Sequence, residues 1–246
     1  MGEVIIFSNL PIYTLGLVAV FCFLWGSFVF YKKALEAHLE GSTILDMVVL
    51  SAFWAIILGR ISFVLTNITI FFGHWTRAFL LINFPGVERW GVLLGLFLGI
   101  FLIVKKKKGK YLDHLDLAVL GYLSGVSFFW IGINFINFYW QNLVLAIFNL
   151  AMFMIFWKAE RTYRLISWYR GTKSFAKSGF VTGFGITATA MSFLIEKILY
   201  RNMSIWSLVW SLGLLVAGLV LVYIRSGRLL ADDIKALKIW NKNPKK

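Results

Sequence analysis

Seven segments of mostly apolar residues divide the chain, and each is about as long as a helix that crosses a bilayer. They lie at 12–31, 44–65, 86–104, 115–138, 140–157, 179–200 and 204–224. Roughly 20 apolar residues in a helix cover the roughly 30 Å of hydrocarbon in a bilayer. The pattern predicts an all-α integral membrane protein. We expect a seven-transmembrane-helix bundle over residues 1–225, followed by a basic tail at 226–246.

Lysine and arginine lie mainly on one side of these segments. Most of the 25 Lys and Arg residues fall at 32–33, 105–110, 158–177 and 225–246, which follow the first, third, fifth and seventh segments. Positively charged loops stay in the cytoplasm during insertion. The N-terminus is therefore expected outside the membrane and the C-terminus in the cytoplasm.

Composition changes how the net charge of +14 is interpreted. Such a charge would usually suggest a nucleic-acid partner, but 60% of the residues are apolar and only 15% are charged. The basic residues act as topological anchors, so no nucleic-acid partner is expected. The single cysteine, Cys22, lies in the first apolar segment, and the pair His114 and Asp116 lacks further ligands. We expect no metal and no cofactor.

Glycines recur at every fourth position in three of the segments. This spacing lets two helix backbones approach closely in a membrane, so it predicts packing seams. The glycines are Gly91, Gly95 and Gly99 in the third segment, Gly121 and Gly125 in the fourth, and Gly179 and Gly183 in the sixth.

A group of polar residues lies at the depth of the outer headgroups, near the outer ends of the predicted helices. Charged residues inside a membrane are costly and usually functional. Arginine suits a phosphate because its planar donors bind two oxygens at once, whereas amides can hold glycerol hydroxyls. These residues predict an outward lipid-headgroup site with Arg60 as its main cation. The predicted binding residues are Arg60, Asn134, Glu196, Asn137, Glu88 and Arg89.

A structural interpretation of the same residues stays open. Arg60 would form an ion pair with Glu196 or Glu88 that fixes helix packing, and Arg89 would extend to the interface, as long basic side chains do. Residues 66–85 are aromatic enough for an interfacial arm that lies on the membrane. Within this arm His74 is a surface histidine or a candidate substitute base. Asp116, at the cytoplasmic start of the fourth segment, is expected to cap that helix.

Four stretches resemble the bacterial prolipoprotein diacylglyceryl transferase family, in order and in membrane side. The first is Gly16-Leu17, followed by basic residues. The second is Leu58-Gly59-Arg60-Ile61-Ser62-Phe63-Val64-Leu65. The third joins Trp90-Gly91-Val92-Leu93-Leu94-Gly95, the lysine run, Leu115-Asp116-Leu117 and Asn134-Phe135-Ile136-Asn137. The fourth runs from Met191 to Glu196 and includes the segment from Ser204 to Arg225.

The resemblance implies a seven-helix enzyme of the bacterial cytoplasmic membrane. Such an enzyme moves a diacylglyceryl group from phosphatidylglycerol to the lipobox cysteine of a prolipoprotein. Its partners would be phosphatidylglycerol, prolipoprotein signal peptides and membrane lipids. The reaction needs a thiolate and cations around the leaving phosphate. Arg60, Asn134 and Glu196 fall where the family binds the headgroup.

The chain departs from the family pattern at three positions. Trp90 stands where the family has a histidine, and Trp130-Ile131-Gly132-Ile133 replaces a stretch with a Gly-Arg pair. Ser192 stands at the position of a later arginine. Two hypotheses follow: a divergent transferase that uses Arg60 with Glu88, Arg89 or His74, or a non-catalytic membrane protein, a pseudoenzyme, that keeps a groove for phospholipid or signal peptide.

Overall fold

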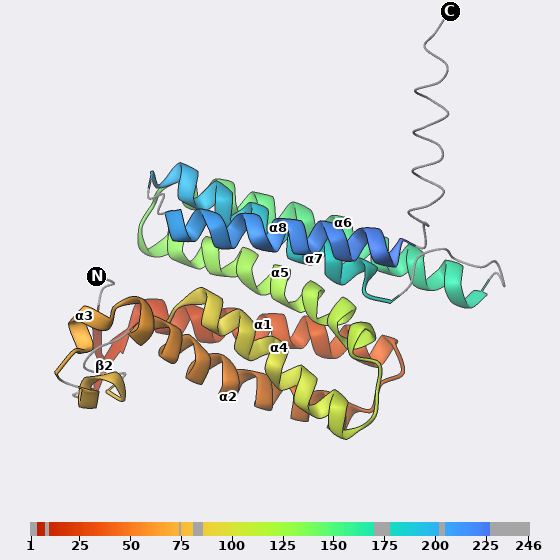
Figure 1. Ribbon diagram of the computed structural model, residues 1–246, viewed down its shortest axis with the longest axis horizontal. Coiled ribbons are helices and arrows are strands. Elements are labelled where there is room, and N and C mark those ends of the chain that lie inside the picture. Colours follow the sequence, from red (N-terminus) through yellow and green to blue (C-terminus); the bar gives the residue numbers. More distant parts are fainter. Residues whose placement is uncertain are drawn as a thin grey trace, which may run out of the picture.

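Seven long helices build the part of the chain that the structure describes (Figure 1), as the apolar pattern predicted. The computed structural model describes residues 4–7, 10–73, 75–80, 86–169, 178–201 and 205–226. The long helices are α1 (Thr14–Glu36), α2 (Gly41–Thr66), α4 (Arg89–Lys106), α5 (Tyr111–Ile136), α6 (Trp140–Tyr169), α7 (Phe180–Leu199) and α8 (Ile205–Arg225). A short helix α3 (Ile68–Phe71) and a 3-10 turn η1 (Trp75–Ala78) lie between α2 and α4.

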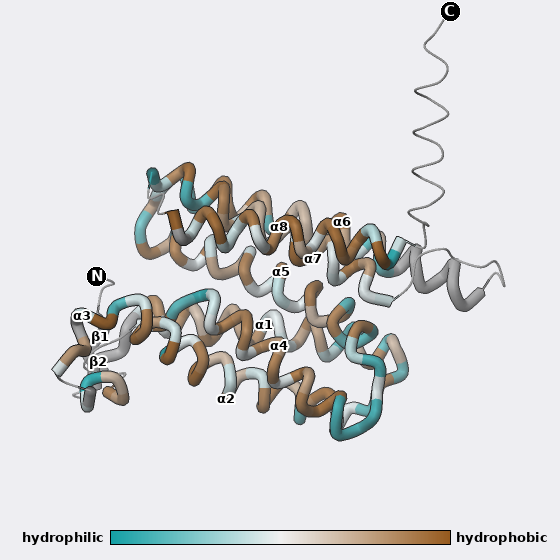
Figure 2. The backbone as a smooth tube through the Cα atoms, in the orientation of Figure 1, coloured by the Kyte–Doolittle hydropathy of each residue, from teal (hydrophilic) through white to brown (hydrophobic). Residues whose placement is uncertain are grey.

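Five of the helices are long and apolar enough to cross a membrane. They span Thr14–Glu36, Gly41–Thr66, Tyr111–Ile136, Trp140–Glu160 and Ser207–Arg225. Apolar residues run along the helices and hydrophilic residues gather near their ends (Figure 2), as in the turn at 105–110. The protein is therefore a multi-pass helical membrane protein.

The other two long helices differ from these five, because α4 carries three basic residues and α7 carries a series of buried polar residues. Helix α4 begins with Arg89 and ends with Lys105 and Lys106. Helix α7 contains Thr182, Thr187, Thr189, Ser192 and Glu196, all of which are buried against other helices. A helix covered by protein needs less apolar surface than one that faces lipid, so the sequence of α7 suits an interior position.

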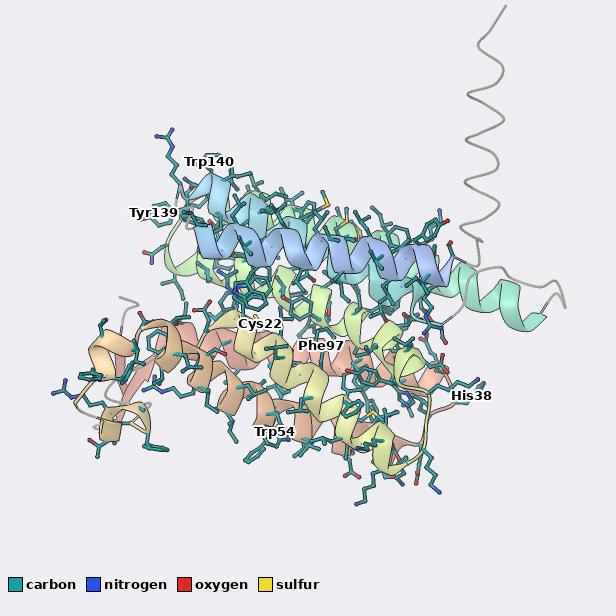
Figure 3. All side chains as sticks on the ribbon, in the orientation of Figure 1. Cys22, His38, Trp54, Phe97, Tyr139 and Trp140 are labelled. Carbon is teal, nitrogen blue, oxygen red and sulfur yellow. The ribbon has the colours of Figure 1, made fainter. Side chains whose placement is uncertain are left out.

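The helices form two groups on either side of α5 (Figure 1). One group contains α1, α2 and α4, and the other contains α6, α7 and α8. Helix α2 packs along α4, α1 along α5, α5 against α6, and α7 along α8. Tyr139 and Trp140 mark one end of the bundle and His38 the opposite end (Figure 3).

Glycines hold the closest helix contacts, as their spacing predicted. A Cβ atom built on Gly26 of α1 would lie 2.7 Å from the carbonyl oxygen of Gly121 on α5, and one on Gly121 would lie 2.6 Å from the carbonyl oxygen of Gly26. Gly91, Gly95 and Gly99 meet the backbone of α2 in the same way. The α1–α5 and α2–α4 seams therefore exist because these positions lack a side chain.

The predicted pair of Gly179 and Gly183 divides between two roles. Gly183 lies against Val222 and Gly218 of α8, so it belongs to a packing seam. Gly179 is instead the residue that precedes α7, and its φ of 96° is a left-handed conformation that glycine adopts without strain. Only one of the two glycines therefore serves the helix packing that their spacing suggested.

The carboxylate of Asp116 caps α7 and not its own helix, which corrects the prediction from its position. One oxygen accepts a hydrogen bond from the backbone N–H of Gly179 at 2.8 Å. The other accepts from the N–H of Thr182 at 2.7 Å and from its hydroxyl at 2.6 Å. A carboxylate at a helix N-terminus satisfies free N–H groups and the helix dipole.

A two-stranded antiparallel hairpin precedes α1, and the apolar pattern did not predict it. Strand β1 (Val4–Phe7) pairs with β2 (Leu10–Tyr13), with Val4 opposite Tyr13 and Phe7 opposite Leu10. The predicted first helix began at residue 12, whereas α1 begins at Thr14. The hairpin lies at the same end of the bundle as α3 (Figure 1).

Candidate functional site

Arg60 binds the backbone of the segment that links α2 to α4. It lies in the last two turns of α2 and is 7% exposed. Its Nε donates to the carbonyl oxygen of Ala78 at 2.7 Å, and its two terminal nitrogens donate to the carbonyl oxygens of Arg77 and Gly86, each at 3.0 Å. The guanidinium therefore fastens the segment between α2 and α4 to α2. A role for Arg60 in headgroup binding stays a prediction.

Arg89 and Glu196 form a two-point ion pair between α4 and α7. Each terminal nitrogen of Arg89 donates to one carboxylate oxygen of Glu196. Arg89 is the first residue of α4, and Glu196 lies in the last turn of α7. This pairing differs from both structural predictions: Glu196 pairs with Arg89 and not with Arg60, and Arg89 is held by a carboxylate. The expected depth of these residues was not enough to identify the neighbours.

The two partners differ in exposure. The Arg89 side chain is 42% exposed, whereas the Glu196 side chain is 10% exposed. The carboxylate is thus supplied from inside the bundle, and part of the Arg89 side chain stays accessible. No side-chain hydrogen bond from Glu88 caps the N-terminus of α4 within the described part of the chain. The start of α4 therefore combines a cation with an uncapped helix N-terminus, which both favour an anion.

Aromatic rings surround the ion pair. The Cζ atom of Arg89 lies 5.4 Å from the ring centres of both Trp130 and Phe193. The rings of Trp90 and Phe193 are 4.4 Å apart, and those of Trp90 and Trp210 are 6.4 Å apart. These rings contribute cation–π attraction and carry the side-chain contacts between α4 and the α7–α8 pair.

One donor beside the ion pair has no partner. Trp130 is 4% exposed, and among the described residues no acceptor binds its indole Nε1. Leaving a buried N–H without a partner costs about 1–3 kcal/mol, so most such groups in proteins are satisfied. A further oxygen acceptor at this position would remove that cost.

Buried amides and hydroxyls continue from the ion pair between α6 and α7. The hydroxyl of Tyr200 donates to Oδ1 of Asn142, and Nδ2 of Asn149 donates to the hydroxyl of Ser192 at 2.9 Å. Asn142 and Asn149 are 0% and 1% exposed. They were not recognised from the sequence, although their spacing of seven residues inside an apolar segment places both on one helix face. Ser192 therefore has a structural contact of its own.

The remaining predicted site residues lie in the last turn of α5 or at helix caps, at the same end of the bundle. Oδ1 of Asn134 accepts a hydrogen bond from the backbone N–H of Tyr139 at 3.1 Å. Asn137 ends α5, and its carbonyl oxygen accepts from Nδ2 of Asn142 at 3.2 Å. Glu88 precedes α4, and its N–H donates to the carbonyl oxygen of Gly59 at 2.9 Å. Arg60, Asn134 and Glu196 thus take part in three separate sets of contacts.

His74, the candidate substitute base, lies outside the described residues. His114 is buried, and its Nδ1 lies 2.8 Å from the carbonyl oxygen of Lys110. Within the ranges that the structure describes, no three His, Cys, Asp or Glu side chains are grouped as a metal would need.

A second buried ion pair lies at the opposite end of the bundle. Nζ of Lys33 on α1 is 3.3 Å from Glu160 on α6 and 2.9 Å from Glu36. It also lies 3.8 Å from the ring centre of Trp157. Lys33 is 3% exposed, so it acts inside the bundle in addition to its expected role as a topological anchor.

Comparison with known proteins agrees with the resemblance seen in the sequence. A family model described as prolipoprotein diacylglyceryl transferase matches residues 3–140, which is more than half of the chain. The chain belongs to the prolipoprotein diacylglyceryl transferase family. No curated protein matches it. The matched part runs from the hairpin to the start of α6, so it contains Arg60, Arg89 and Asn134 and stops before Glu196.

The three departures from the family pattern lie around the Arg89–Glu196 pair. Trp90, at the position of the family's histidine, stacks on Phe193. Trp130 belongs to the stretch that replaces the Gly-Arg pair, and its ring flanks Arg89. Ser192 lies one helical turn before Glu196 on α7. Arg89 thus lies among aromatic rings, at the place where the resemblance implies a histidine and further cations.

Proposed function

We propose that this protein transfers a diacylglyceryl group from phosphatidylglycerol to the lipobox cysteine of prolipoproteins, with Arg89 binding the headgroup phosphate. The family match supports the class of reaction. The observation that carries the assignment to Arg89 is its two-point ion pair with Glu196. A guanidinium that binds both oxygens of a carboxylate has the geometry to bind two oxygens of a phosphate.

This proposal includes a seven-span topology in a bacterial cytoplasmic membrane, with the N-terminus outside. In that orientation, the start of α4 and the end of α7 lie at the outer leaflet, where phospholipid headgroups and secreted precursors meet. The lysine-rich turn between α4 and α5 then lies in the cytoplasm, as the distribution of positive charge requires. The same topology directs Glu88, Asn134 and Asn137 to the headgroup region, as candidates for contacts with glycerol hydroxyls.

Arg89 would assist the reaction through charge. When the cysteine thiolate attacks the diacylglyceryl carbon, the C–O bond to phosphate breaks and glycerol phosphate leaves with the electron pair, so the proton that the thiol has lost can pass through water to the leaving phosphate. A fixed cation beside the phosphate stabilises this leaving group, and it is most effective where water is scarce. The rings of Trp90, Trp130 and Phe193 provide such surroundings for Arg89.

The test is to express the protein in bacteria depleted of their own transferase. Mass spectrometry of a lipoprotein precursor should then detect the added diacylglyceryl group. The double variant Arg89→Gln/Glu196→Gln, which leaves no unpaired charge, should lower modification about 100-fold, the usual effect of losing a preorganised charge-stabilising group. Lys197→Gln is the control, because it removes a basic residue next to Glu196 from the same helix. Well-expressed protein that yields no modified precursor would overturn the proposal.

A second candidate function is lipid binding without catalysis, and the side chain of Trp90 favours it. The family's histidine position is occupied by a ring stacked 4.4 Å from Phe193, and an indole can neither accept nor supply a proton at neutral pH. Under this alternative, phosphatidylglycerol still co-purifies with the protein in native mass spectrometry. The precursor in depleted cells, however, stays unmodified.

A further inference from the structure

We propose that Glu196 occupies the phosphate position on Arg89, and that an anionic phosphate ligand binds by exchanging with this carboxylate. The structure then corresponds to the closed state of the site. This inference rests on the proposed function in one respect: the proposed function identifies the phosphate ligand as the headgroup of a lipid.

The geometry of the ion pair supports an exchange. The two oxygens of Glu196 occupy the end-on fork that the two terminal nitrogens of Arg89 form. A phosphate diester presents two free oxygens with a similar spacing, so it competes for the same nitrogens. A phosphate therefore cannot take the two-point position unless Glu196 leaves it.

Exposure shows from which side the exchange can occur. Arg89 is 42% exposed and Glu196 only 10%. A ligand can approach the accessible part of the Arg89 side chain and displace a carboxylate that belongs to the interior. Because one anion replaces another, Arg89 keeps an anionic partner throughout the exchange.

Two groups favour the incoming anion over Glu196. The N-terminus of α4 is not capped by the Glu88 side chain, and its dipole attracts negative charge. The indole Nε1 of Trp130 is a buried donor with no acceptor among the described residues, and its ring lies 5.4 Å from the Cζ atom of Arg89. A phosphate has more acceptor oxygens than a carboxylate, so it can use Arg89 and a further donor together.

The exchange would also loosen a seam of the bundle. Helices α4 and α7 do not pack along each other, unlike α2 with α4 or α7 with α8. Their contacts are side-chain contacts, namely the Arg89–Glu196 pair and the stacking of Trp90 on Phe193. When Glu196 is displaced, the ionic part of this connection is released while the neighbouring seams remain.

The test measures phosphate binding by the full-length protein in detergent with native mass spectrometry. The probes are short-chain phosphatidylglycerol, inorganic phosphate, and diacylglycerol, which has no phosphate. Glu196→Gln removes the internal competitor and should raise affinity for the phosphate probes at least about tenfold. Glu160→Gln is the control, because it also removes a buried carboxylate from an ion pair, while Lys33 stays paired with Glu36 at 2.9 Å. We expect less than a twofold change for this control.

Further variants separate exchange from general structural damage. Arg89→Gln/Glu196→Gln keeps the seam uncharged and should lose the gain in binding, and Arg89→Lys should bind more weakly because lysine has no fork. A gain for phosphatidylglycerol alone identifies a lipid ligand, whereas an equal gain for inorganic phosphate identifies a free anion. Unchanged or weaker phosphate binding by folded Glu196→Gln overturns the proposal, as does an equal gain for diacylglycerol. Transfer activity without exchange would leave the proposed function intact, and exchange without transfer would refute only the proposed function.

Discussion

Asp116 and Thr182 are 66 positions apart in the sequence, and two hydrogen bonds join them in the buried part of the bundle. The contact fixes the first turn of α7 against α5. Because the same carboxylate also accepts from the N–H of Gly179 at 2.8 Å, three donors depend on one side chain. The start of α7 is therefore determined by a residue of another helix.

We predict that Asp116→Ala destabilises the protein by about 2–3 kcal/mol, because it leaves buried donors at a helix N-terminus without an acceptor. The measurement is unfolding by SDS in mixed micelles. Asp113→Ala is the matched control, since Asp113 lies one turn earlier on α5 and is only partly buried. Equal stability of the two variants would show that the cap does not hold α7.

Gly121→Ala should weaken the seam between α1 and α5. The added Cβ would lie 2.6 Å from the carbonyl oxygen of Gly26 and 3.0 Å from Cβ of Phe30, so the helices must separate. Such overpacking costs about 1–3 kcal/mol. Gly213→Ala on α8 is the control, because its Cβ meets nothing within 4 Å and alanine favours helix by up to about 1 kcal/mol. In detergent, Gly121→Ala should be inactivated at a lower temperature than the wild type. Gly213→Ala should be inactivated at a higher temperature than the wild type.

Arg60→Lys tests whether Arg60 holds the segment between α2 and α4. A lysine keeps the charge but cannot donate in a fixed fork to the carbonyl oxygens of Arg77, Ala78 and Gly86. We expect limited proteolysis to cut between α2 and α4 faster in this variant, while the helices stay folded. Arg201→Lys, at an exposed turn of the same end, should leave the cleavage rate unchanged. An unaltered digestion pattern for Arg60→Lys would contradict the fastening role.

Much of the fold could be predicted from the sequence, because a lipid bilayer requires long apolar helices and confines most positive charge to the loops between them. The helix seams were also predictable, since Gly121 and Gly95 follow a spacing that only close approach explains. The hairpin before α1 was not, because its eight paired residues, 4–7 and 10–13, are apolar enough to continue an apolar segment. Apolar pattern alone does not separate a short strand from the end of a helix.

The candidate site was only partly predictable. The positions of Arg60, Arg89 and Glu196 along the predicted helices placed them near one end of the bundle. They did not show which helix each side chain faces. Arg60 donates to backbone carbonyl oxygens of the segment after α2. No pattern of side chains in the sequence reveals such acceptors. One structural alternative paired Glu196 with Arg60, whereas Glu196 pairs with Arg89. The indole donor of Trp130, which has no acceptor among the described residues, became visible only from its surroundings.

Lys33 provides the last prediction, because it separates two roles of positive charge at the end of the bundle that is predicted to be cytoplasmic. As an anchor, it would be interchangeable with its exposed neighbour Lys32. As a buried partner of Glu160, it holds α1 against α6, and Lys33→Gln would leave that carboxylate buried beside Trp157. Breaking a buried ion pair from one side costs about 3 kcal/mol or more. SDS unfolding should therefore show a clear loss for Lys33→Gln and no measurable loss for Lys32→Gln. Equal behaviour of the two would mean that both lysines serve only the topology.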